Sequence, residues 1–335
     1  MWGASQPHTL RERPVRATHP VTLGSQEREL VVVGGSFSHD DVRPDTSQQA
    51  CPFGACQGGH LGASSAAFMS AFSTRRRFIV LSALALAGTV SAGLWLRRSS
   101  VTRWTMINVC PGEAQADCHL LSLPDGTHAL IDAADAADAP GTALAYLQKH
   151  RIKRLALVVL THFHKDHYGR LADMIRAGIV VDRVAINLPG SREIADRERP
   201  WGCDWEDVQA LLAFLRERRI PYFTPVAGER LIECHCAGIL TSLDVIALFD
   251  GYNTPFGKTD INDTSIILRL THGPTRVLFT GDLNVRMSDY LVKESYDVSA
   301  QLLKVPHHGA SGHASNAFFD RVAPKAAFAP TPRVL

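Results

Sequence analysis

Three histidines and one aspartate are crowded into the short segment THFHKDH, which directly follows the apolar run LALVVL. They fit the pattern H-x-H-x-D-H and are His162, His164, Asp166 and His167. Because side chains that alternate along an extended loop point in different directions, one short loop can present two ligand sets to two adjacent metal ions. Neutral imidazoles and carboxylates suit zinc, and also manganese or iron, and the lack of a nearby thiolate argues against a closed structural zinc site. The alternative is a His-rich surface loop, which the apolar strand before the motif and the helix expected near Gly169 disfavour.

Two further apolar strands end in side chains that can bind metal. The segment VLFTGD ends in Asp282, and the segment LLKVPHHGAS carries the pair His307 and His308 after its apolar part. A carboxylate and an imidazole at separate strand ends can supply the further ligands that a metal site at the histidine motif requires. The sequence therefore predicts one metal site to which several strand ends contribute.

The elements that position these residues alternate between strands and helices. Residues 155–160 form the buried strand before the histidine motif, and residues 169–178 and 204–219 show the apolar spacing of amphipathic helices. The second of these helices can be capped by Asp204. Strands, helix, strand and helix recur roughly twice, which predicts an α/β fold with two sheets packed face to face and helices outside. A further helix is expected at 142–150, and further strands are expected at 104–109, 118–123, 128–133, 183–187, 243–249, 265–270, 276–280, 302–305 and 325–329.

Three motifs follow the histidine motif in the order NDTSIILRL (262–270), RVLFTGD (276–282) and LKVPHHGAS (303–311). With them the chain resembles the metallo-β-lactamase superfamily. It is most similar to the metallo-hydrolase domain of ComEC-type competence proteins, which act in bacterial DNA uptake. The resemblance covers residues 104–329. It implies an enzyme, a metal-dependent hydrolase, whose fold is an αββα sandwich of two mixed sheets with a two-metal site at the sheet edges.

The resemblance also implies a role for each residue that matches the family's motifs. His162 and His164 hold one metal ion, whereas Asp166 and His167 hold the other. Asp282 bridges the two ions. These roles assign the whole histidine motif to metal binding.

Five further positions match the family's pattern. One of His307 and His308 completes a ligand shell, and the sequence leaves open which of the two it is. Asp132, in the segment LIDA, is the superfamily's early aspartate, which supports the site from behind. Asn262 and Ser265 match a polar pair of the subgroup and lie near the pocket, although a turn-capping role for Asn262 is an open alternative.

The chain departs from the subgroup in several places. The usual Gly-rich turn is here CPGEA, in which Glu113 stands where an aspartate is usual, and the glycine usual after Asp132 is absent. Competence channels carry many membrane segments, whereas this chain has at most one, so it does not itself form a DNA pore. The chain stops at APTPRVL, where relatives continue into a loop with another histidine, and we therefore expect a truncated C-terminus.

The charge of the chain bears on its partners. The formal net charge is +2, but residues 93–335 hold 27 basic and 27 acidic side chains and contain no basic block. Proteins that grip long nucleic acids carry a clustered basic surface. The resemblance implies a phosphodiester substrate, with another small molecule as an alternative, and the charge leaves nucleic acid as a partner without its usual basic patch.

The segment before the expected domain predicts an export signal. Residues 69–98 contain the run TRRRF, then an apolar stretch and the cleavage-like VSA, which is the pattern of a twin-arginine signal peptide. A membrane anchor formed by residues 78–96 is the alternative. Residues 1–68 are then a disordered or mis-assigned upstream segment. Residues 101–335 form the hydrolase domain, which is expected in the periplasm or outside the cell.

These features together predict an exported hydrolase in which two divalent ions, most simply zinc, activate a water molecule. Two cations about 3.5–4 Å apart lower the pKa of a shared water and clamp the attacking and leaving oxygens. Asp166 is expected to orient that water and to take up its proton. The bond attacked is expected to be a phosphodiester. Hydrolysis of a β-lactam or a lactone, and a non-catalytic module that only binds metal, remain as alternatives.

Overall fold

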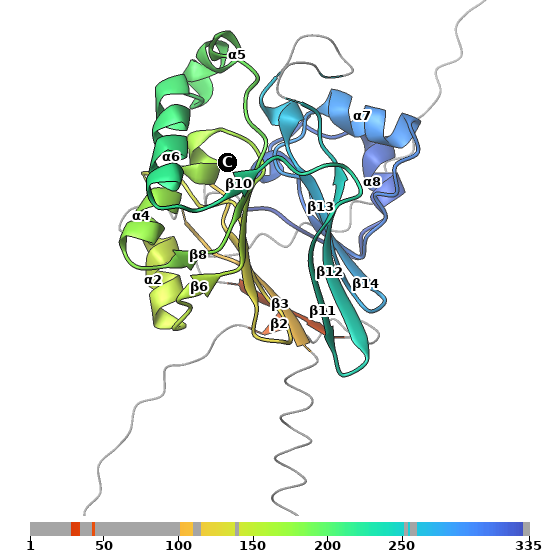
Figure 1. Ribbon diagram of the computed structural model, residues 1–335. Coiled ribbons are helices and arrows are strands. Elements are labelled where there is room, and N and C mark those ends of the chain that lie inside the picture. The colour runs from red at the N-terminus through yellow and green to blue at the C-terminus, as the bar shows by residue number, and fades with distance from the viewer. Residues whose placement is uncertain are drawn as a thin grey trace, which may run out of the picture.

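A computed structural model describes residues 28–33, 42–43, 101–109, 115–137, 141–250, 254 and 260–330. Two β-sheets lie face to face in it, and helices cover the outer face of each (Figure 1). Both sheets contain parallel and antiparallel strand pairs. The predicted α/β fold, an αββα sandwich of two mixed sheets, is therefore confirmed.

The first sheet has eight strands, in the order β10 (Tyr222–Phe223), β9 (Val184–Ile186), β7 (Leu157–Leu160), β5 (His128–Ile131), β4 (His119–Ser122), β3 (Val101–Met106), β1 (Arg28–Val33) and β2 (Val42–Arg43). The pairs β3–β4 and β4–β5 are antiparallel. The pairs β5–β7, β7–β9 and β9–β10 are parallel. This parallel part carries the histidine motif, because the motif directly follows β7.

The second sheet has six strands, in the order β11 (Arg230–Cys236), β12 (Ile239–Ala247), β13 (Ile267–His272), β14 (Thr275–Phe279), β15 (Leu302–Lys304) and β16 (Ala326–Phe328). Its first four strands are antiparallel, and β14, β15 and β16 are parallel. A separate two-stranded sheet pairs β6 (Arg154–Leu155) with β8 (Val180–Val181).

Helices cover the outer faces of the two sheets (Figure 1). The first sheet is covered by α2 (Thr142–Lys149), α4 (Leu171–Arg176) and α6 (Trp205–Glu217), with α5 (Arg192–Arg197) at one end. The second sheet is covered by α7 (Val285–Lys293) and α8 (Asn316–Val322). One-turn elements are α3 (Lys165–Tyr168), η2 (Arg199–Trp201), η3 (Asn262–Thr264) and η4 (His307–Gly309).

Helix α6 forms for reasons that are visible in its residues. The Asp204 side chain accepts hydrogen bonds from the backbone N–H groups of Glu206 and Asp207, at 3.0 and 3.4 Å. These bonds satisfy donors that have no partner within the helix. The buried face consists of the four spaced apolar residues Val208, Leu211, Leu212 and Leu215.

Apolar side chains from both sheets fill the space between them. Trp104 is completely buried there, and its ring meets Phe279 and Phe328 edge-on, with centroids 4.9 and 5.5 Å apart. A second apolar layer lies between the first sheet and its helices, and a third lies between the second sheet and α7 and α8. Apolar layers therefore cover both faces of each of the two large sheets.

Some elements differ from the sequence-based expectations. The helix expected at 169–178 is shorter, because α4 begins at Leu171. Strand β11 is not among the expected strands; it lies at the sheet's edge, and its sequence RLIECHC mixes three polar residues with four apolar ones. Helix α7 is not among the expected helices, although its sequence VRMSDYLVK carries apolar residues on a face from which Met287 and Leu291 are buried.

The domain boundaries stay predictions. Strands β1 and β2 lie inside residues 1–68, and β1 pairs with β3. The rest of that segment and the whole of 69–98 lie outside the described residues. Among the helices that the structure describes, none combines the length and apolar character needed to cross a membrane.

Candidate metal centre

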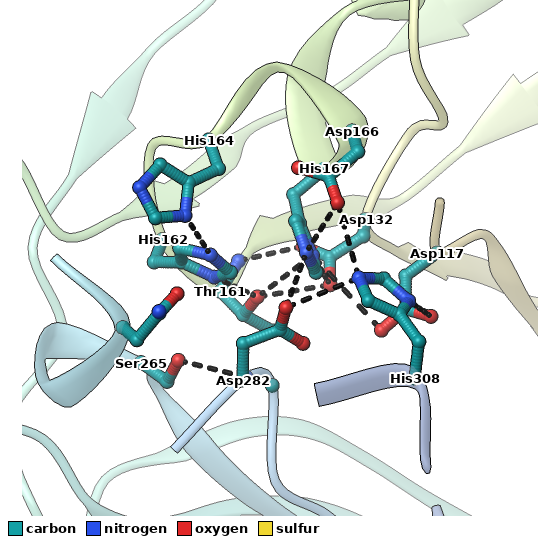
Figure 2. Close-up of polar contacts among 12 residues, drawn as sticks. Asp117, Asp132, Thr161, His162, His164, Asp166, His167, Ser265, Asp282 and His308 are labelled. Atoms are coloured by element: carbon teal, nitrogen blue, oxygen red, sulfur yellow. Dashed lines mark hydrogen bonds and ion pairs between the residues drawn. The ribbon is translucent and has the colours of Figure 1, made fainter. Parts of the chain in front are cut away.

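The candidate ligands lie together where strands of both sheets end (Figure 2). The histidine motif follows β7, and Asp132 follows its parallel neighbour β5. Asp282 follows β14, and His308 follows its parallel neighbour β15. Parallel strands end at the same edge of a sheet, and functional sites form at such edges. Side chains from distant parts of the sequence therefore meet at one point.

Four of these residues form a compact group that we call the acidic cluster: Asp166, His167, Asp282 and His308. Each offers one ligand atom, and these atoms lie within 4.8 Å of one another. Asp282 Oδ2 is 3.2 Å from His167 Nε2 and 3.1 Å from His308 Nε2. Asp166 Oδ2 is 3.0 Å from His308 Nε2 and 3.6 Å from His167 Nε2. Two carboxylates and two imidazoles thus converge from three separate segments.

The other two histidines of the motif form a pair beside the acidic cluster. His162 Nε2 and His164 Nδ1 are 3.1 Å apart, and the His162 and His167 rings are 4.0 Å apart between centroids. Burial lowers the pKa of His162 well below its usual range, and the neighbouring His167 lowers it further. Burial also lowers the pKa of His164. Both imidazoles are therefore neutral, which is the form that binds metal.

Two supporting residues hold the ligands from behind. Asp132 accepts hydrogen bonds from the backbone N–H and the hydroxyl of Thr161, at 2.7 and 2.9 Å. Its Oδ2 also lies 2.8 Å from His167 Nδ1. A carboxylate only accepts, so this contact assigns the proton to Nδ1 and leaves Nε2 to face the cluster. Ser265 accepts a hydrogen bond from the backbone N–H of Asp282 at 3.1 Å.

The polar residue Asn262 lies in η3, and its backbone carbonyl accepts a hydrogen bond from the backbone N–H of Ser265 at 3.1 Å. Its backbone N–H donates to Asp260 Oδ1 at 2.9 Å, so Asp260 rather than Asn262 supplies the side-chain oxygen of that turn. The Asn262 side-chain oxygen is buried and makes no hydrogen bond among the described residues. Its place near the pocket and its role stay predictions.

The structure separates the two histidines that the sequence could not distinguish. His308 belongs to the acidic cluster, whereas the His307 ring lies against His313 with the ring centroids 3.7 Å apart. Burial lowers the pKa of His307 to about 4. Both residues have positive φ angles, 49° and 53°, which cost about 1–2 kcal/mol each for a residue with a side chain. Such strain tends to be kept where function requires it.

Two charged residues that the sequence analysis did not identify lie directly behind the cluster. Asp117 is completely buried, and its Oδ1 is 3.2 Å from His308 Nδ1. Lys304 is also buried and forms an ion pair with Asp117 Oδ2. A charged residue within an apolar strand such as LLKV is rarely buried unless it is paired, and this was the available signal for Lys304. Glu113, named above as the replacement for a usual aspartate, lies outside the described residues.

The charges of the acidic cluster favour cations. Burial disfavours the charged form of His167, but the carboxylates of Asp282 and Asp166 outweigh burial and raise its pKa well above the usual range. The pKa of His308 is raised against burial by Asp282 and Asp117. Burial would raise the pKa of Asp282, yet the nearby positive groups hold it well below its usual range. The carboxylates therefore stabilise positive charge at this point.

These donors fit divalent metal ions. Imidazole nitrogen and carboxylate oxygen are the ligands of zinc, manganese and iron, and the described residues place no thiolate in the cluster. Asp117, Asp132 and His167 also lie close together, but Lys304 pairs with Asp117, and His167 Nδ1 faces Asp132. The group of Asp117, Asp132 and His167 therefore supports the acidic cluster and does not form a metal site of its own.

Residues 111–212 match the family model of the metallo-beta-lactamase superfamily. Together with the αββα sandwich, this match shows a metallo-β-lactamase domain in this part of the chain, and the superfamily is one of metal-dependent hydrolases. The resemblance drawn from the motifs is confirmed.

Two curated relatives carry names from competence. The chain is 21% identical over 189 residues to ComE operon protein 3 of Bacillus subtilis (strain 168), covering 55% of this chain and 21% of that protein. It is 26% identical over 207 residues to Competence protein ComA of Neisseria gonorrhoeae, covering 60% of this chain and 24% of that protein. The chain thus spans less than a quarter of the length of either relative.

Solved structures of related fold include the metallo-beta-lactamase fold protein YhfI from Bacillus subtilis. It is 13% identical with a TM-score of 0.39, and the match covers 69% of this chain and 87% of that one. A diphosphatase from the PhnP family is 14% identical with a TM-score of 0.34, and the match covers 64% of this chain and 72% of that one.

Proposed function

We propose that this chain is an exported hydrolase that cleaves phosphodiester bonds with a water molecule activated by two divalent ions, most simply zinc. The observation that carries the proposal is the presence of two adjoining ligand sets. His162 Nε2 and His164 Nδ1 lie 3.1 Å apart, and the four ligand atoms of the acidic cluster lie within 4.8 Å of one another. A site built for one ion does not need six ligands.

The residues divide naturally between two ions. His162 and His164 would hold the first ion, and Asp166, His167 and His308 would hold the second. Asp282 would bridge them through Oδ2, the oxygen that faces His167 and His308. When bound, the ions would polarise the scissile group and lower the pKa of a water molecule.

Asp166 differs from the rest of the acidic cluster in its exposure. Its side chain is 22% exposed, whereas those of His167, His308 and Asp282 are 0, 1 and 3% exposed. A group that orients water and accepts its proton must be reachable by solvent and substrate. Exposure and position therefore favour Asp166 as the catalytic base among these four residues.

The surface beside the motif favours a small substrate. Glu198, at the end of α5, lies 3.9 Å from His164, so the segment around α5 borders the site. The arginines of this segment are paired with acids, Arg192 with Glu206, Arg197 with Glu193 and Arg199 with Asp196. Paired arginines do not form the free basic surface that long nucleic acids need. We therefore propose a small phosphodiester before a polynucleotide.

The test combines metal analysis with hydrolysis assays on the full chain. Bis(p-nitrophenyl) phosphate, single-stranded DNA and nitrocefin are incubated with the protein, with and without a chelator. We expect two bound ions and chelator-sensitive cleavage of a phosphodiester. Asp166→Ala and His164→Ala should each reduce this cleavage by at least about 100-fold, the size of a lost general base. His235→Ala is the control, because His235 is 66% exposed on β11.

Each other result has a definite meaning. Cleavage of nitrocefin alone would replace the phosphodiester by a lactam as substrate. Bound metal without turnover of any substrate would favour a non-catalytic binding module. Activity that survives in Asp166→Ala would reject the role proposed for this carboxylate.

Export is the remaining part of the proposal, and it rests on the twin arginines at 75 and 76 and the apolar stretch that follows them. Cell fractionation of the full chain and of a variant with both arginines changed to lysine tests it. We expect the domain outside the cytoplasm in the first case and inside in the second. Tight membrane association of the exported form would favour an anchor at 78–96.

A further inference from the structure

Lys304 is a buried lysine whose ammonium group lies behind the acidic cluster. Its side chain is 1% exposed. Nζ donates a hydrogen bond to the backbone carbonyl of Gly281 at 2.9 Å, forms an ion pair with Asp117, and lies 3.3 Å from Asp282 Oδ1. A buried charge is costly unless it is paired and hydrogen-bonded. The position of this ammonium is therefore fixed by two carboxylates and one carbonyl group.

The contact with Asp282 gives the two oxygens of this carboxylate separate partners. Oδ1 faces Lys304, and Oδ2 faces the Nε2 atoms of His167 and His308. The backbone on the same side is held by the hydrogen bond from Asp282 N–H to Ser265. A carboxylate held in this way offers a single oxygen to metal ions. A free carboxylate can rotate and chelate one ion with both oxygens, and it then no longer bridges two.

The ion pair between Lys304 and Asp117 supports His308, the other candidate ligand from the second sheet. Asp117 Oδ1 lies 3.2 Å from His308 Nδ1, which directs Nε2 of this ring into the cluster. The same oxygen lies 3.6 Å from His119 Nε2, and His119 Nδ1 accepts a hydrogen bond from Trp104 Nε1 at 3.4 Å. Asp117 is thus also anchored to a buried framework that does not involve the candidate ligands.

We propose that Lys304 is a positioning residue that holds Asp282 in the orientation needed to bridge two metal ions. The proposal rests on the two-metal function proposed above. It predicts that loss of the Lys304 contact weakens the binding of one ion and spares the other, because Asp282 then serves a single ion with both oxygens.

Charge alone predicts the opposite effect, so the decisive variant must keep the charge of the site constant. Removing only the ammonium makes the site more negative and would strengthen the binding of cations. The double variant Lys304→Met with Asp117→Asn removes one positive and one negative charge together. The asparagine side chain at position 117 keeps an oxygen that can accept from His308 Nδ1, and no buried charge of the Lys304–Asp117 pair is left unpaired.

The experiment measures cobalt binding by visible absorbance and zinc content by elemental analysis in the full chain. In the double variant we expect the affinity for the more weakly bound of the two ions to fall by about 10- to 100-fold, the usual effect of losing a supporting contact. The more tightly bound ion should bind as in the wild type, and the cobalt spectrum should change as Asp282 alters its coordination. Lys153→Met is the matched control, because Lys153 is exposed and far from the ligands in sequence.

A second double variant guards against a loss of fold. It combines Lys304→Gln with Asp117→Asn, so that the glutamine amide supplies a neutral donor that can reach toward Asp282 Oδ1. We expect it to bind both ions, and its affinity for the more weakly bound ion should exceed that of the methionine variant. If the methionine variant unfolds, two bound ions in the glutamine variant support the proposal and a single one overturns it.

The proposal is also overturned if the folded methionine variant binds two ions with wild-type affinities. A wild-type chain that binds no metal would instead reject the proposed function itself. The two failures are distinguishable because the second one is seen before any residue is changed.

Discussion

Replacing Gly281 by alanine tests how closely the strand end that carries Asp282 is packed. Gly281 has a φ angle of +51°, in the left-handed region. A β-carbon at this position would lie 2.7 Å from Ser265 Oγ and 3.1 Å from Thr161 Cβ. The first distance is shorter than any real contact of this kind, so the Ser265 hydroxyl must move. Asp282 would then lose the group that accepts its backbone N–H.

Three costs add up in this variant. An alanine in the left-handed region costs about 1–2 kcal/mol. Overpacking against Ser265 costs about 1–3 kcal/mol, and the lost hydrogen bond costs about 1 kcal/mol. We therefore expect the free energy of unfolding to fall by about 3–6 kcal/mol. Gly126→Ala is the matched control, because Gly126 has φ +87° and nothing within 4 Å of the added carbon, so only the first cost applies.

Urea unfolding of both variants, together with the wild type, measures the difference. Gly281→Ala should lose about 2–4 kcal/mol more than Gly126→Ala, which corresponds to the packing and hydrogen-bond costs. Zinc binding should weaken only in Gly281→Ala, because only this substitution displaces Asp282. Equal losses of stability in the two variants would refute the close packing of Gly281 against Ser265.

Two further predictions concern pH and metal removal. Burial and then the nearby Asp260 raise the pKa of Asp263 to about 6, above its value in the unfolded chain. Ionisation of this carboxyl group therefore lowers the stability of the fold above pH 6 and has no such effect below about pH 4. Asp263→Asn should raise the free energy of unfolding by about 2–3 kcal/mol at pH 7.5 and leave it unchanged at about pH 4. The control Asp320→Asn, at an exposed residue, should leave the free energy of unfolding unchanged at both pH values. An equal gain for Asp263→Asn at both pH values in urea unfolding would contradict the raised pKa. Removal of metal by a chelator should lower the melting temperature, since a ligand at a thousand times its Kd stabilises by about 4 kcal/mol, and a melting curve that is indifferent to added zinc would argue against the metal centre.

Much of the fold could be predicted from local patterns. Strand β7 is apolar throughout, and the spacing of Val208, Leu211, Leu212 and Leu215 in α6 reports a buried helical face directly. Two-residue strands such as β8 and β10 are too short to show a period. They form only where the fold brings each of them beside a neighbouring strand, which is a property of the whole domain.

The sequence by itself determined the chemical types of the candidate ligands and their place after apolar strands, because a polar cluster such as THFHKDH stands out against its apolar neighbours. Only the tertiary structure decided that His308 rather than His307 joins Asp166 and Asp282, since adjacent residues in a strained turn point in different directions. The structure also decided the pairing of Asp117 with Lys304. Asp117 precedes β4 of the first sheet and Lys304 lies in β15 of the second. How two sheets pack depends on the shapes of many side chains at once, which no local periodicity records.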